Sequence, residues 1–481
     1  MSAREAILPK DGRPPKDYLP LEEALARLCR EVTPVSGLEL VGLLEASGRI
    51  LAMDMDAPMD NPPFDRSPVD GYALCGNDTR EASREHPACF KVIAEIDAGS
   101  YYPGTVQPGE AVRIMTGAPI PKGCDVCVRQ EDTDYGEDRV EVYVPCRAGM
   151  NYCYAGEDFV KGQRMLAAGT KLGYVEISVL ASMGVKEVPV YRRPRIALLT
   201  TGDELVFPGT PLAPGKIYNS NLFGLGARLR ELGFAPAYIR QLPDDGPGAA
   251  KVVAEAAKTM DLILTTGGVS VGKKDIIHDV LNLAGARRLF WGIQIKPGMP
   301  TLASMVGGVP LISLTGNPFG ALATFELLVR PVLSKLCRDD TLPAPKARAV
   351  FYGAFQKASP VRRFVRARYT PADILASGTD TAGAPEGTVT APGADAVGMS
   401  ACTFAPEASR ISAPAGTVTA PGADGAGAPG ISGAGGFVTL PQGSHSSGVL
   451  ASMRGCNCLI DIPAGSSGLC EGTLVDVFLI E

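Results

Sequence analysis

Hydrophobic and polar positions change their spacing several times along the chain. In residues 194–337, short hydrophobic runs alternate with stretches whose apolar residues recur every three or four positions. The runs predict strands at residues 195–200, 237–242, 261–265 and 311–314, and the periodic stretches predict helices at 221–232, 249–258, 275–283 and 321–336. This alternation favours a doubly wound, mostly parallel sheet, in which ligands bind beyond the carboxyl ends of the strands.

The flanking segments have other patterns. Residues 20–50 have the spacing of a helix, with an apolar stripe that begins at Leu21 and Ala24. Residues 54–145 contain short β-type runs separated by Pro, Gly and Asp, and residues 172–183 again have helical spacing. We therefore expect a helical segment at 18–53 and 146–190, an inserted β-rich domain at 54–145, an α/β domain at 191–337, and a strand-and-turn domain at 343–481.

One stretch of the last domain has a biased composition. Residues 376–448 are rich in Ala, Gly, Pro, Ser and Thr, and the sequence GTVTAPGAD occurs in them twice. Two copies are too few for a solenoid, and the composition is typical of a flexible insertion. We expect a disordered or weakly structured loop between strands, without a catalytic role.

Composition narrows the class of protein. The chain has 481 residues, a net charge of −6, 45% hydrophobic and 20% charged residues. Sizeable cores are possible, and the acidic balance disfavours a nucleic-acid binder. No apolar run reaches the ~18 residues of a membrane span, and the first twenty residues lack a signal-peptide pattern, so a cytoplasmic location is the default expectation. The pair Cys124 and Cys127 has metal or redox spacing, but no second pair or nearby His completes a site, so buried small residues are the favoured interpretation.

The most informative stretch is residues 261–275, DLILTTGGVSVGKKD. A buried strand that ends in glycines can bring backbone N–H groups close to a phosphate. Gly267, Gly272 and Lys273 nearly form a Walker A loop, but Lys274 stands where that motif has a hydroxyl for Mg²⁺. The segment therefore predicts phosphate binding while arguing against an ordinary P-loop NTPase. The carboxylate of Asp275 is the candidate replacement for the missing metal contact.

Acidic turns follow several predicted strands. They contain Asp70, Asp158, the pair Asp203 and Glu204, and the pair Asp244 and Asp245. Each alone is ordinary turn chemistry. Together with Asp275 they could surround a hard cation and a phosphate, because Mg²⁺ prefers a few oxygen ligands. Lys273, Lys274 and Lys296 provide positive charge, and the turn Thr315–Pro318 offers backbone N–H groups and the Asn317 amide.

Several motifs, in order along nearly the whole chain outside the insertion, resemble one family. They are NPPFDRSPVDGYA at 61–73, RIMTGAPIPKG at 113–123, RQE at 129–131, AGED at 155–158, TGDEL at 201–205, GGVSVG at 267–272 with Asp275, KPG at 296–298, GNP at 316–318, GSH at 443–445 and GSSGL at 465–469. This set resembles the MoeA/gephyrin E-domain family, the molybdopterin molybdenumtransferases. Any single motif is weak, but the ordered set is specific.

The resemblance implies a fold, a reaction and partners. The implied architecture is multidomain α/β: a doubly wound, mostly parallel sheet domain of the MogA/MoaB type, an inserted β-rich domain, a helical segment and a C-terminal β-barrel. The implied assembly is a homodimer with its cleft between the α/β domain of one subunit and the inserted domain of the other. The reaction exchanges the AMP of adenylylated molybdopterin for molybdate with Mg²⁺. Contacts with a molybdopterin adenylyltransferase and with molybdoenzymes are also implied, without nucleic acid or membrane.

The resemblance also assigns residues to roles. Catalytic roles fall to Asp70, Thr116, Asp158, Glu204 and Lys296, and metal binding falls to Asp244, Asp275 and Glu204. Substrate binding falls to Thr201, Gly202, Asp203, Gly267, Gly268, Val269, Ser270, Gly272, Lys273, Pro297, Gly298, Gly316, Asn317, Pro318 and Ser444. The glycines allow the backbone to approach a pyrophosphate, and Lys296 would counter the oxyanion charge.

Three positions depart from the family pattern. Gly292 and Met299 stand where lysines are frequent, and Thr315 stands where Pro is usual. The loss of positive charge bears on oxyanion or phosphate binding, for which Lys273 and Lys274 are candidate replacements. Two other functions are weighed against molybdenum insertion. One is a molybdopterin adenylyltransferase, which the additional domains disfavour, and the other is a non-catalytic molybdopterin-binding scaffold, which the retained acids disfavour.

Overall fold

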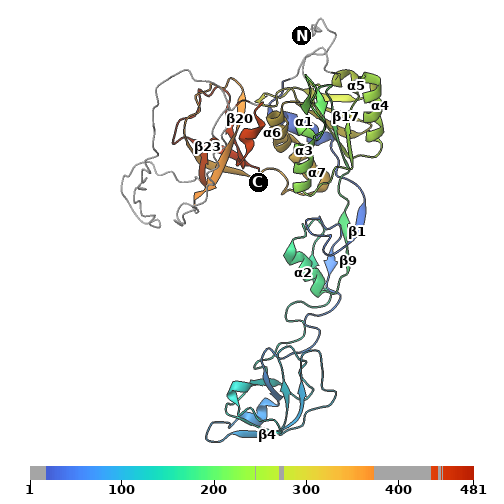
Figure 1. Ribbon diagram of the computed structural model, residues 1–481. Coiled ribbons are helices and arrows are strands. Elements are labelled where there is room, and N and C mark those ends of the chain that lie inside the picture. Colours follow the sequence, from blue (N-terminus) through green and yellow to red (C-terminus); the bar gives the residue numbers. More distant parts are fainter. Residues whose placement is uncertain are drawn as a thin grey trace, which may run out of the picture. The chain divides into compact units, whose positions relative to one another are not determined.

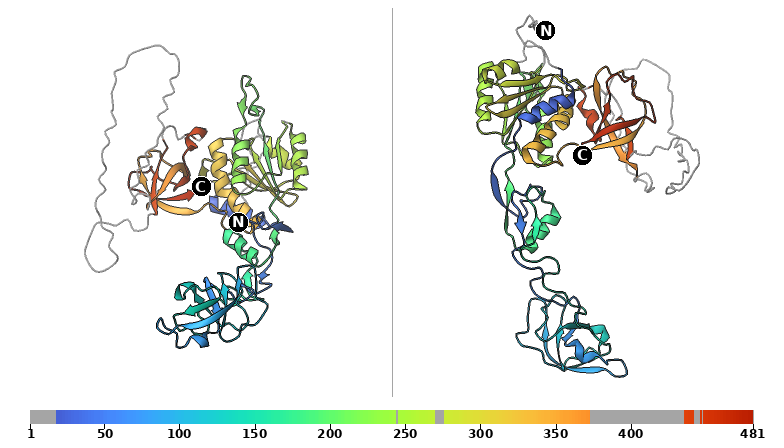
Figure 2. Two further views of the ribbon diagram at one scale, coloured as in Figure 1. Left: turned by 60° about the horizontal axis from the view of Figure 1, so that its bottom comes forward. Right: turned by 180° about the vertical axis from the view of Figure 1, so that it is seen from behind.

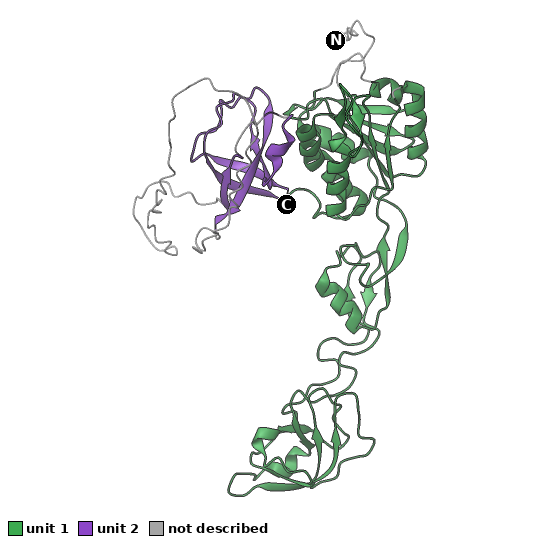
Figure 3. Ribbon diagram, in the orientation of Figure 1, with its two compact units in different colours: residues 1–344 green, residues 345–481 purple. Residues whose placement is uncertain are grey.

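The computed structural model describes residues 18–243, 245–269, 276–372, 435–441, 446 and 448–480. The chain divides into two compact units, residues 1–344 and residues 345–481, which Figure 3 distinguishes by colour. Unit 1 contains an α/β sheet domain, a β-rich domain and a segment that connects them, and unit 2 is a β-barrel. Each unit is described by itself below.

The α/β domain contains a sheet whose described strands have the order β13-β10-β14-β18-β17-β15 (Figure 1). Their bounds are β10 Ile196–Thr200, β13 Tyr238–Gln241, β14 Leu262–Thr266, β15 Arg287–Trp291, β17 Leu302–Val306 and β18 Val309–Leu314. Strands β13, β10, β14 and β18 are parallel, whereas β17 and β15 are antiparallel to their neighbours. The prediction of a mostly parallel sheet is therefore correct, although the two antiparallel strands were not predicted from the sequence.

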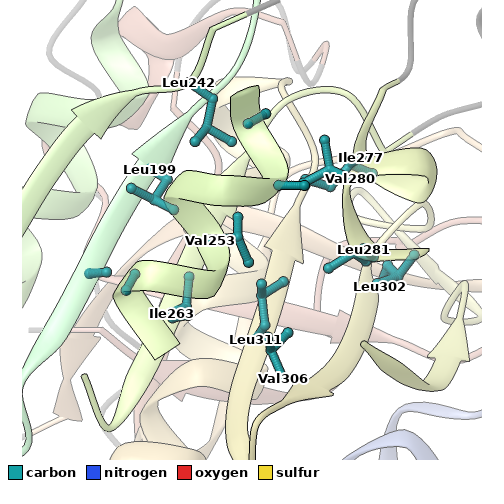
Figure 4. Packing of buried hydrophobic residues seen from close by; sticks show 14 of the residues in the cluster. Leu199, Leu242, Val253, Ile263, Ile277, Val280, Leu281, Leu302, Val306 and Leu311 are labelled. Carbon is teal, nitrogen blue, oxygen red and sulfur yellow. The ribbon is translucent and has the colours of Figure 1, made fainter. Parts of the chain in front are cut away.

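Helices cover both faces of this sheet (Figure 2). Their bounds are α1 Leu21–Glu31, α3 Ser220–Glu231, α4 Gly246–Ala257, α5 Ile277–Leu283, α6 Pro318–Thr324 and α7 Arg330–Cys337. On one face, side chains of α4 and α5 such as Val253 and Val280 pack on Leu199, Ile263 and Leu311 of the strands (Figure 4). All five of these side chains are fully buried, so this contact is a major source of hydrophobic stabilisation for the domain.

A π-helical turn, Phe325–Val329, joins α6 to α7. Pro331 follows this turn in the first residues of α7, and its ring removes one backbone donor and crowds the preceding turn. The widened turn keeps the chain helical in spite of the proline. The single helix predicted over 321–336 is therefore present as α6, the π-helical turn and α7 in direct succession.

The connecting segment pairs chain portions that are far apart in sequence. Strand β1 (Leu38–Gly42) is antiparallel to β9 (Glu187–Tyr191), and β2 (Met55–Asp56) is antiparallel to β8 (Arg164–Leu166). Helix α2 (Tyr174–Ser182) packs over them around Leu51 and Leu180. The β-rich domain therefore lies in sequence between the two portions of the connecting segment, β1 and β2 before it and β8 and β9 after it, which pair with each other. The sequence predicts this insertion.

The β-rich domain has a sheet of order β6-β3-β5-β4-β7 within the described residues. Its strands are β3 Gly71–Leu74, β4 Ala88–Ile96, β5 Glu110–Ile114, β6 Val126–Arg129 and β7 Arg139–Val142. Separate core clusters cover the two faces. Cys124 and Cys127 are buried on one of them, and burial raises their pKa values to about 12 and about 11, so they favour the protonated thiol.

Unit 2 is a barrel in which β20, β21, β19, β23 and β22 pair in that order and β20 also pairs with β22. The bounds are β19 Lys346–Tyr352, β20 Arg362–Pro371, β21 Gly436–Thr439, β22 Cys458–Ile462 and β23 Leu474–Leu479. Strand β21 lies inside the stretch 376–448 that composition marks as a weakly structured insertion. Phe437, Val438 and Thr439 are good strand formers, and Val438 is fully buried between β19 and β20. Residues 436–439 are therefore a strand and not part of a weakly structured loop, whereas residues 376–434 of the predicted insertion lie outside the described residues.

The helix expected over residues 20–50 is also shorter than its pattern suggests. Helix α1 ends at Glu31, Val32 is extended, and β1 begins at Leu38. Pro34 disfavours helical backbone at Thr33, and Gly37 adopts a left-handed conformation with φ 105°. Helix α1 packs against α7 and β15, so it belongs to the α/β domain rather than to the connecting segment.

A buried ion cluster holds α3 against the α6–α7 helix. The carboxylate of Glu326, a residue only 5% exposed, accepts from Arg228 Nε at 2.7 Å and from Arg330 Nη1 at 2.7 Å. Arg330 is 6% exposed and also donates to the carbonyl of Leu342 at 2.6 Å. Removing the shared carboxylate would leave two guanidinium groups facing each other in a site with little water.

We predict that Glu326→Ala lowers the free energy of unfolding of the α/β domain by about 3–5 kcal/mol, because it leaves buried charge uncompensated. Glu231→Ala is the matched control, since it removes an exposed carboxylate from the same Arg228, and it should cost at most about 1 kcal/mol. Urea denaturation followed by the fluorescence of Trp291, the only tryptophan of the chain, measures both values. Equal losses for the two variants would contradict the prediction.

Candidate functional site

The carboxyl edge of the parallel sheet brings two predicted loops into direct backbone contact. The chain leaves β10 toward β13 on one side of the sheet, and it leaves β14 toward β15, β17 and β18 on the other side, so the crevice between β10 and β14 is the switch point of the sheet. Beyond it, Thr201 N–H donates to Thr266 O at 3.0 Å. A Cβ atom on Gly267, where φ is 94°, would lie only 2.4 Å from the Thr201 carbonyl oxygen. Glycine is therefore required at this contact.

Two further predicted loops meet beside the first pair. Gly267 N–H donates to Leu314 O, and Gly316 lies close enough that a Cβ atom on it would be 3.5 Å from the Gly267 Cα. The loop 296–298 packs on α6, where a Cβ atom on Gly298 would be 2.2 Å from Oγ1 of Thr324, the last residue of that helix. The predicted substrate-binding residues Thr201, Gly202, Asp203, Gly267, Gly268, Val269, Pro297, Gly298, Gly316, Asn317 and Pro318 thus lie on loops at one end of the domain.

Polar side chains that the sequence analysis did not select hold these loops. Asn221 Nδ2 donates to Thr266 Oγ1 and to Gly316 O, both at 2.9 Å, and so links the loops after β14 and β18. Asn219 caps α3 through its amide oxygen and donates to Thr200 Oγ1 at 2.8 Å. The run Asn-Ser-Asn at the start of a predicted helix is an N-cap signal that would have found them.

Two more such contacts fix the outer loops. Gln241 Nε2 donates to the carbonyls of Gly202 and Leu205, at 3.2 and 3.3 Å, which holds the Thr-Gly-Asp-Glu turn against β13. Trp291 Nε1 donates to Val269 O at 3.2 Å, so the indole holds the end of the glycine loop. These side chains use their polar atoms on the backbone, so they position the site instead of contacting ligand.

Asn317 has a structural function that the sequence did not predict. Its side-chain oxygen accepts from Gly320 N–H at 3.2 Å and caps α6. Thr315, which replaces the usual Pro of the family, accepts from Asn317 N–H through its hydroxyl at 3.3 Å. The turn is therefore ordered by its own side chains before any ligand binds.

The described candidate for a metal ligand at the same edge is a carboxylate, that of Glu204. Glu204 is exposed, and the described residues contain no group of three or more His, Cys, Asp or Glu that could hold a metal ion. A Mg²⁺ ion bound mainly through phosphates and water needs only one or two protein carboxylates. Glu204 therefore fits an ion that arrives with a phosphorylated substrate, and does not fit an ion held by a complete protein cage.

Several predicted residues lie outside the described residues. They are the metal ligands Asp244 and Asp275 and the substrate-binding residues Ser270, Gly272, Lys273 and Ser444. Lys274 and His445 lie outside as well. Their roles therefore remain predictions from the sequence.

Other predicted catalytic residues belong to the β-rich domain and to its borders. Asp70 Oδ1 accepts from both the backbone N–H of Thr116, at 2.7 Å, and its hydroxyl, at 2.8 Å. These two donors lower the pKa of the Asp70 carboxyl below its ordinary value. Asp158 has a different partner, since its carboxylate accepts from Asn61 Nδ2 at 2.9 Å. Asp70 and Thr116 are therefore held together by two hydrogen bonds. The carboxylates of Asp70 and Asp158 are both exposed.

The signature segment 61–70 lies between two loops. Ser67 N–H donates to Ala118 O on one side, and on the other Asp65 accepts from Tyr152 Oη at 2.7 Å and from Ala155 N–H at 2.8 Å. Asp65 thus fixes the loop that carries Asp158. It was not among the predicted site residues, because a single Asp between Phe and Arg has no distinctive spacing.

The structure explains one departure from the family pattern. Gly292 has φ 104°, and a Cβ atom on it would lie 3.1 Å from the ring of Tyr18. Leu19 N–H donates to Gly292 O at 3.1 Å, so the chain before α1 covers this position. A lysine at position 292 would therefore be strained and would meet the tyrosine ring. Lys296, by contrast, is exposed at the end of β16 (Ile295–Lys296).

Comparison with known proteins identifies the family. Residues 19–184 match the MoeA N-terminal region (domain I and II), residues 197–335 match a probable molybdopterin binding domain, and residues 428–480 match the MoeA C-terminal region (domain IV). The sequence is 38% identical to a molybdopterin molybdenumtransferase of Bacillus subtilis over 353 residues, which are 73% of this chain and 82% of the relative. It is 31% identical to a Staphylococcus aureus molybdopterin molybdenumtransferase over 466 residues, 97% of this chain and 96% of the relative.

The fold is similar to that of solved structures. The crystal structure of a molybdopterin biosynthesis MoeA protein from Pyrococcus horikoshii superimposes with a TM-score of 0.71 at 27% identity, covering 97% of this chain and 100% of that one. The expected family and fold class are thereby confirmed. With matches to both terminal regions and to the central domain, the chain belongs to the MoeA family of molybdopterin molybdenumtransferases.

Proposed function

We propose that this protein inserts molybdenum into molybdopterin: it binds adenylylated molybdopterin and molybdate, places Mo on the dithiolene and releases AMP, with Mg²⁺. The observation that carries the proposal is the convergence of three glycine-containing loops beyond β10, β14 and β18. Such an edge suits a nucleotide-linked pterin, because its backbone groups can approach a pyrophosphate without intervening side chains.

The described loops have separate tasks in this proposal. The turn at 202–204 and the loop at 267–269 hold the phosphates of the substrate, since they meet at the switch point. The 296–298 loop and the turn before α6 form the adjoining wall. Lys296 brings an exposed ammonium group to this wall, where it attracts the molybdate dianion and offsets charge that develops as the AMP leaves.

Mg²⁺, when bound, would neutralise phosphate charge and orient the bond to be broken. We propose that Glu204 holds it, together with the sequence-predicted ligands Asp244 and Asp275. The carboxylates of Asp70 and Asp158 and the hydroxyl of Thr116 would organise molybdate or metal on the opposite side of the cleft. The two hydrogen bonds from Thr116 stabilise the ionised form of the Asp70 carboxyl and lower its pKa, which suits a group that holds a cation.

We propose that the protein is a homodimer whose interface includes the connecting segment. Exposed large hydrophobic side chains gather in its elements and the adjoining turn: Leu38 (55% exposed), Leu40 (65%), Leu44 (88%), Tyr174 (85%) and Val175 (51%). Apolar groups in this number on a small segment favour a protein contact. A dimer would also let the β-rich domain of one subunit face the α/β domain of the other.

A cytoplasmic location belongs to the same proposal. The described cysteines are all free of disulfides, as is usual for proteins of reducing compartments. No helix of the described residues is long and apolar enough to cross a bilayer. Contacts with an adenylyltransferase that supplies the substrate and with molybdoenzymes that receive the product follow from the reaction.

The reaction is tested by incubating the protein with adenylylated molybdopterin, Mg²⁺ and molybdate. We predict AMP release that depends on molybdate. Consumption of ATP with free molybdopterin would instead identify an adenylyltransferase, and tight binding without turnover would identify a scaffold. Either of those two outcomes would overturn the proposed reaction.

Glu204→Gln should lower AMP release at least about tenfold at low Mg²⁺, and excess Mg²⁺ should restore part of the rate, because the variant keeps the shape but loses a ligand charge. Glu255→Gln is the control, since it neutralises an exposed carboxylate on α4 that forms an ion pair with Lys258. Titration of Mg²⁺ in the assay gives both responses. An unchanged Mg²⁺ dependence in Glu204→Gln would refute the assignment of this residue.

The double variant Leu44→Asp with Tyr174→Asp should shift the protein from dimer to monomer, because charged groups would replace the apolar contact. Tyr101→Asp, at a side chain 72% exposed in the β-rich domain, is the control and should remain dimeric. Light scattering coupled to size-exclusion chromatography measures the mass. A dimer that survives the double variant would place the interface elsewhere, and a wild-type monomer would reject the dimer itself.

A further inference from the structure

A cavity lies within unit 1, away from the carboxyl edge of the sheet. It has a volume of about 240 Å³ and is formed where the connecting segment meets the end of α3 and the chain after α7. Its walls come from residues 48–50, Lys171, residues 191–193, residues 231–234, Cys337, Asp339 and Leu342. We call it the Arg193 cavity. None of the motifs that define the family site contributes to it.

Most of the charged groups that line this cavity are paired inside the protein. Lys171 Nζ lies 3.0 Å from the Asp339 carboxylate, and Arg192 forms two hydrogen bonds of 2.9 Å with Asp261. Arg49 is buried, and its guanidinium donates to the Glu39 carboxylate and to Tyr191 O. Glu231 pairs with Arg228. These groups therefore do not need a ligand to balance their charge.

Arg193 differs from them. Within the described residues its guanidinium forms no hydrogen bond and no ion pair, although it lies between Gly48 and Gly233, so that a Cβ atom on Gly233 would be 3.3 Å from its Nη2. Partial burial of the guanidinium and, to a smaller extent, the nearby positive charge of Arg49 lower the pKa of Arg193. The residue is exposed, so a ligand can reach it from solvent.

The size and walls of the cavity limit the ligand. About 240 Å³ is the volume of about eight water molecules and is below the range of drug-sized pockets, so the cavity suits a small ligand. Ile50, Phe234 and Leu342 are buried and apolar, so they lower the local dielectric constant and strengthen a charge interaction. A guanidinium fork binds the planar or tetrahedral oxygens of carboxylates and phosphates with two parallel hydrogen bonds.

We propose that the Arg193 cavity binds a small oxyanion, a phosphate or a short carboxylate, through the Arg193 guanidinium. The bound anion would pair with the Arg193 guanidinium and would link the connecting segment to the end of α3. Because ligand binds the folded state, it stabilises that junction by mass action. The proposal does not depend on the molybdenum-insertion reaction.

The test is a thermal-unfolding series with inorganic phosphate and with malonate, each against sodium chloride of equal ionic strength, together with calorimetric titration of the same two anions. We expect at least one anion to raise the unfolding temperature of the wild-type chain beyond the chloride control, and Arg193→Gln to bind it at least tenfold more weakly. Arg80→Gln, which removes the same charge from an exposed position of the β-rich domain, should bind like wild type.

The two anions show whether the cavity prefers phosphate or carboxylate oxygens, because phosphate alone, malonate alone or both can raise the unfolding temperature. Phosphate could also bind at the glycine loops of the sheet edge. Binding there would survive Arg193→Gln unchanged, and that result would overturn the proposal, as would the absence of any effect of either anion on the wild type. Arg193→Lys provides a further check, because it keeps the charge but loses the fork and should bind with intermediate affinity.

Discussion

The close approach of the Gly267 backbone to the Thr201 carbonyl is the contact on which the candidate site depends. A Cβ atom of any side chain at position 267 would lie only 2.4 Å from this carbonyl oxygen, so only glycine fits there. The contact joins the loops after β10 and β14 at the switch point, and the Gly267 N–H then bonds to the end of β18. The ends of β10, β14 and β18 are thereby joined through backbone groups, without side chains between them.

This constraint explains where the chemistry of the protein can lie. Backbone groups of three loops meet at this edge, and the exposed side chains of Glu204 and Lys296 belong to the turn after β10 and to the 296–298 loop. Asn221, Gln241 and Trp291 use their polar atoms to hold the loops, so the edge is ordered without a ligand. A pre-ordered edge reduces the conformational entropy lost on binding a large substrate.

Most of the α/β domain could be predicted from the sequence, because its buried strands and amphipathic helices have distinct periods. Strands β15 and β17 could not, since an antiparallel addition to a parallel sheet gives no local signal. Helix α1 was predicted too long, because its apolar spacing continues past Pro34. The site residues on glycine loops were selected through their motifs. Their supporting amides, Asn219 and Asn221, were missed. The run Asn-Ser-Asn is an N-cap signal that marks them, but their hydrogen bonds to Thr200, Thr266 and Gly316 join residues far apart in sequence and follow no spacing pattern.

The role of this contact in building the site is tested by the affinity of Gly267→Ala for adenylylated molybdopterin. We expect a large loss of binding in a calorimetric titration, because the added methyl group separates the two loops. Gly285→Ala should bind like wild type, since Gly285 also has positive φ, 68°, but a Cβ atom there meets no neighbour within 4 Å. Wild-type affinity in a folded Gly267→Ala would contradict the claim that this contact builds the site.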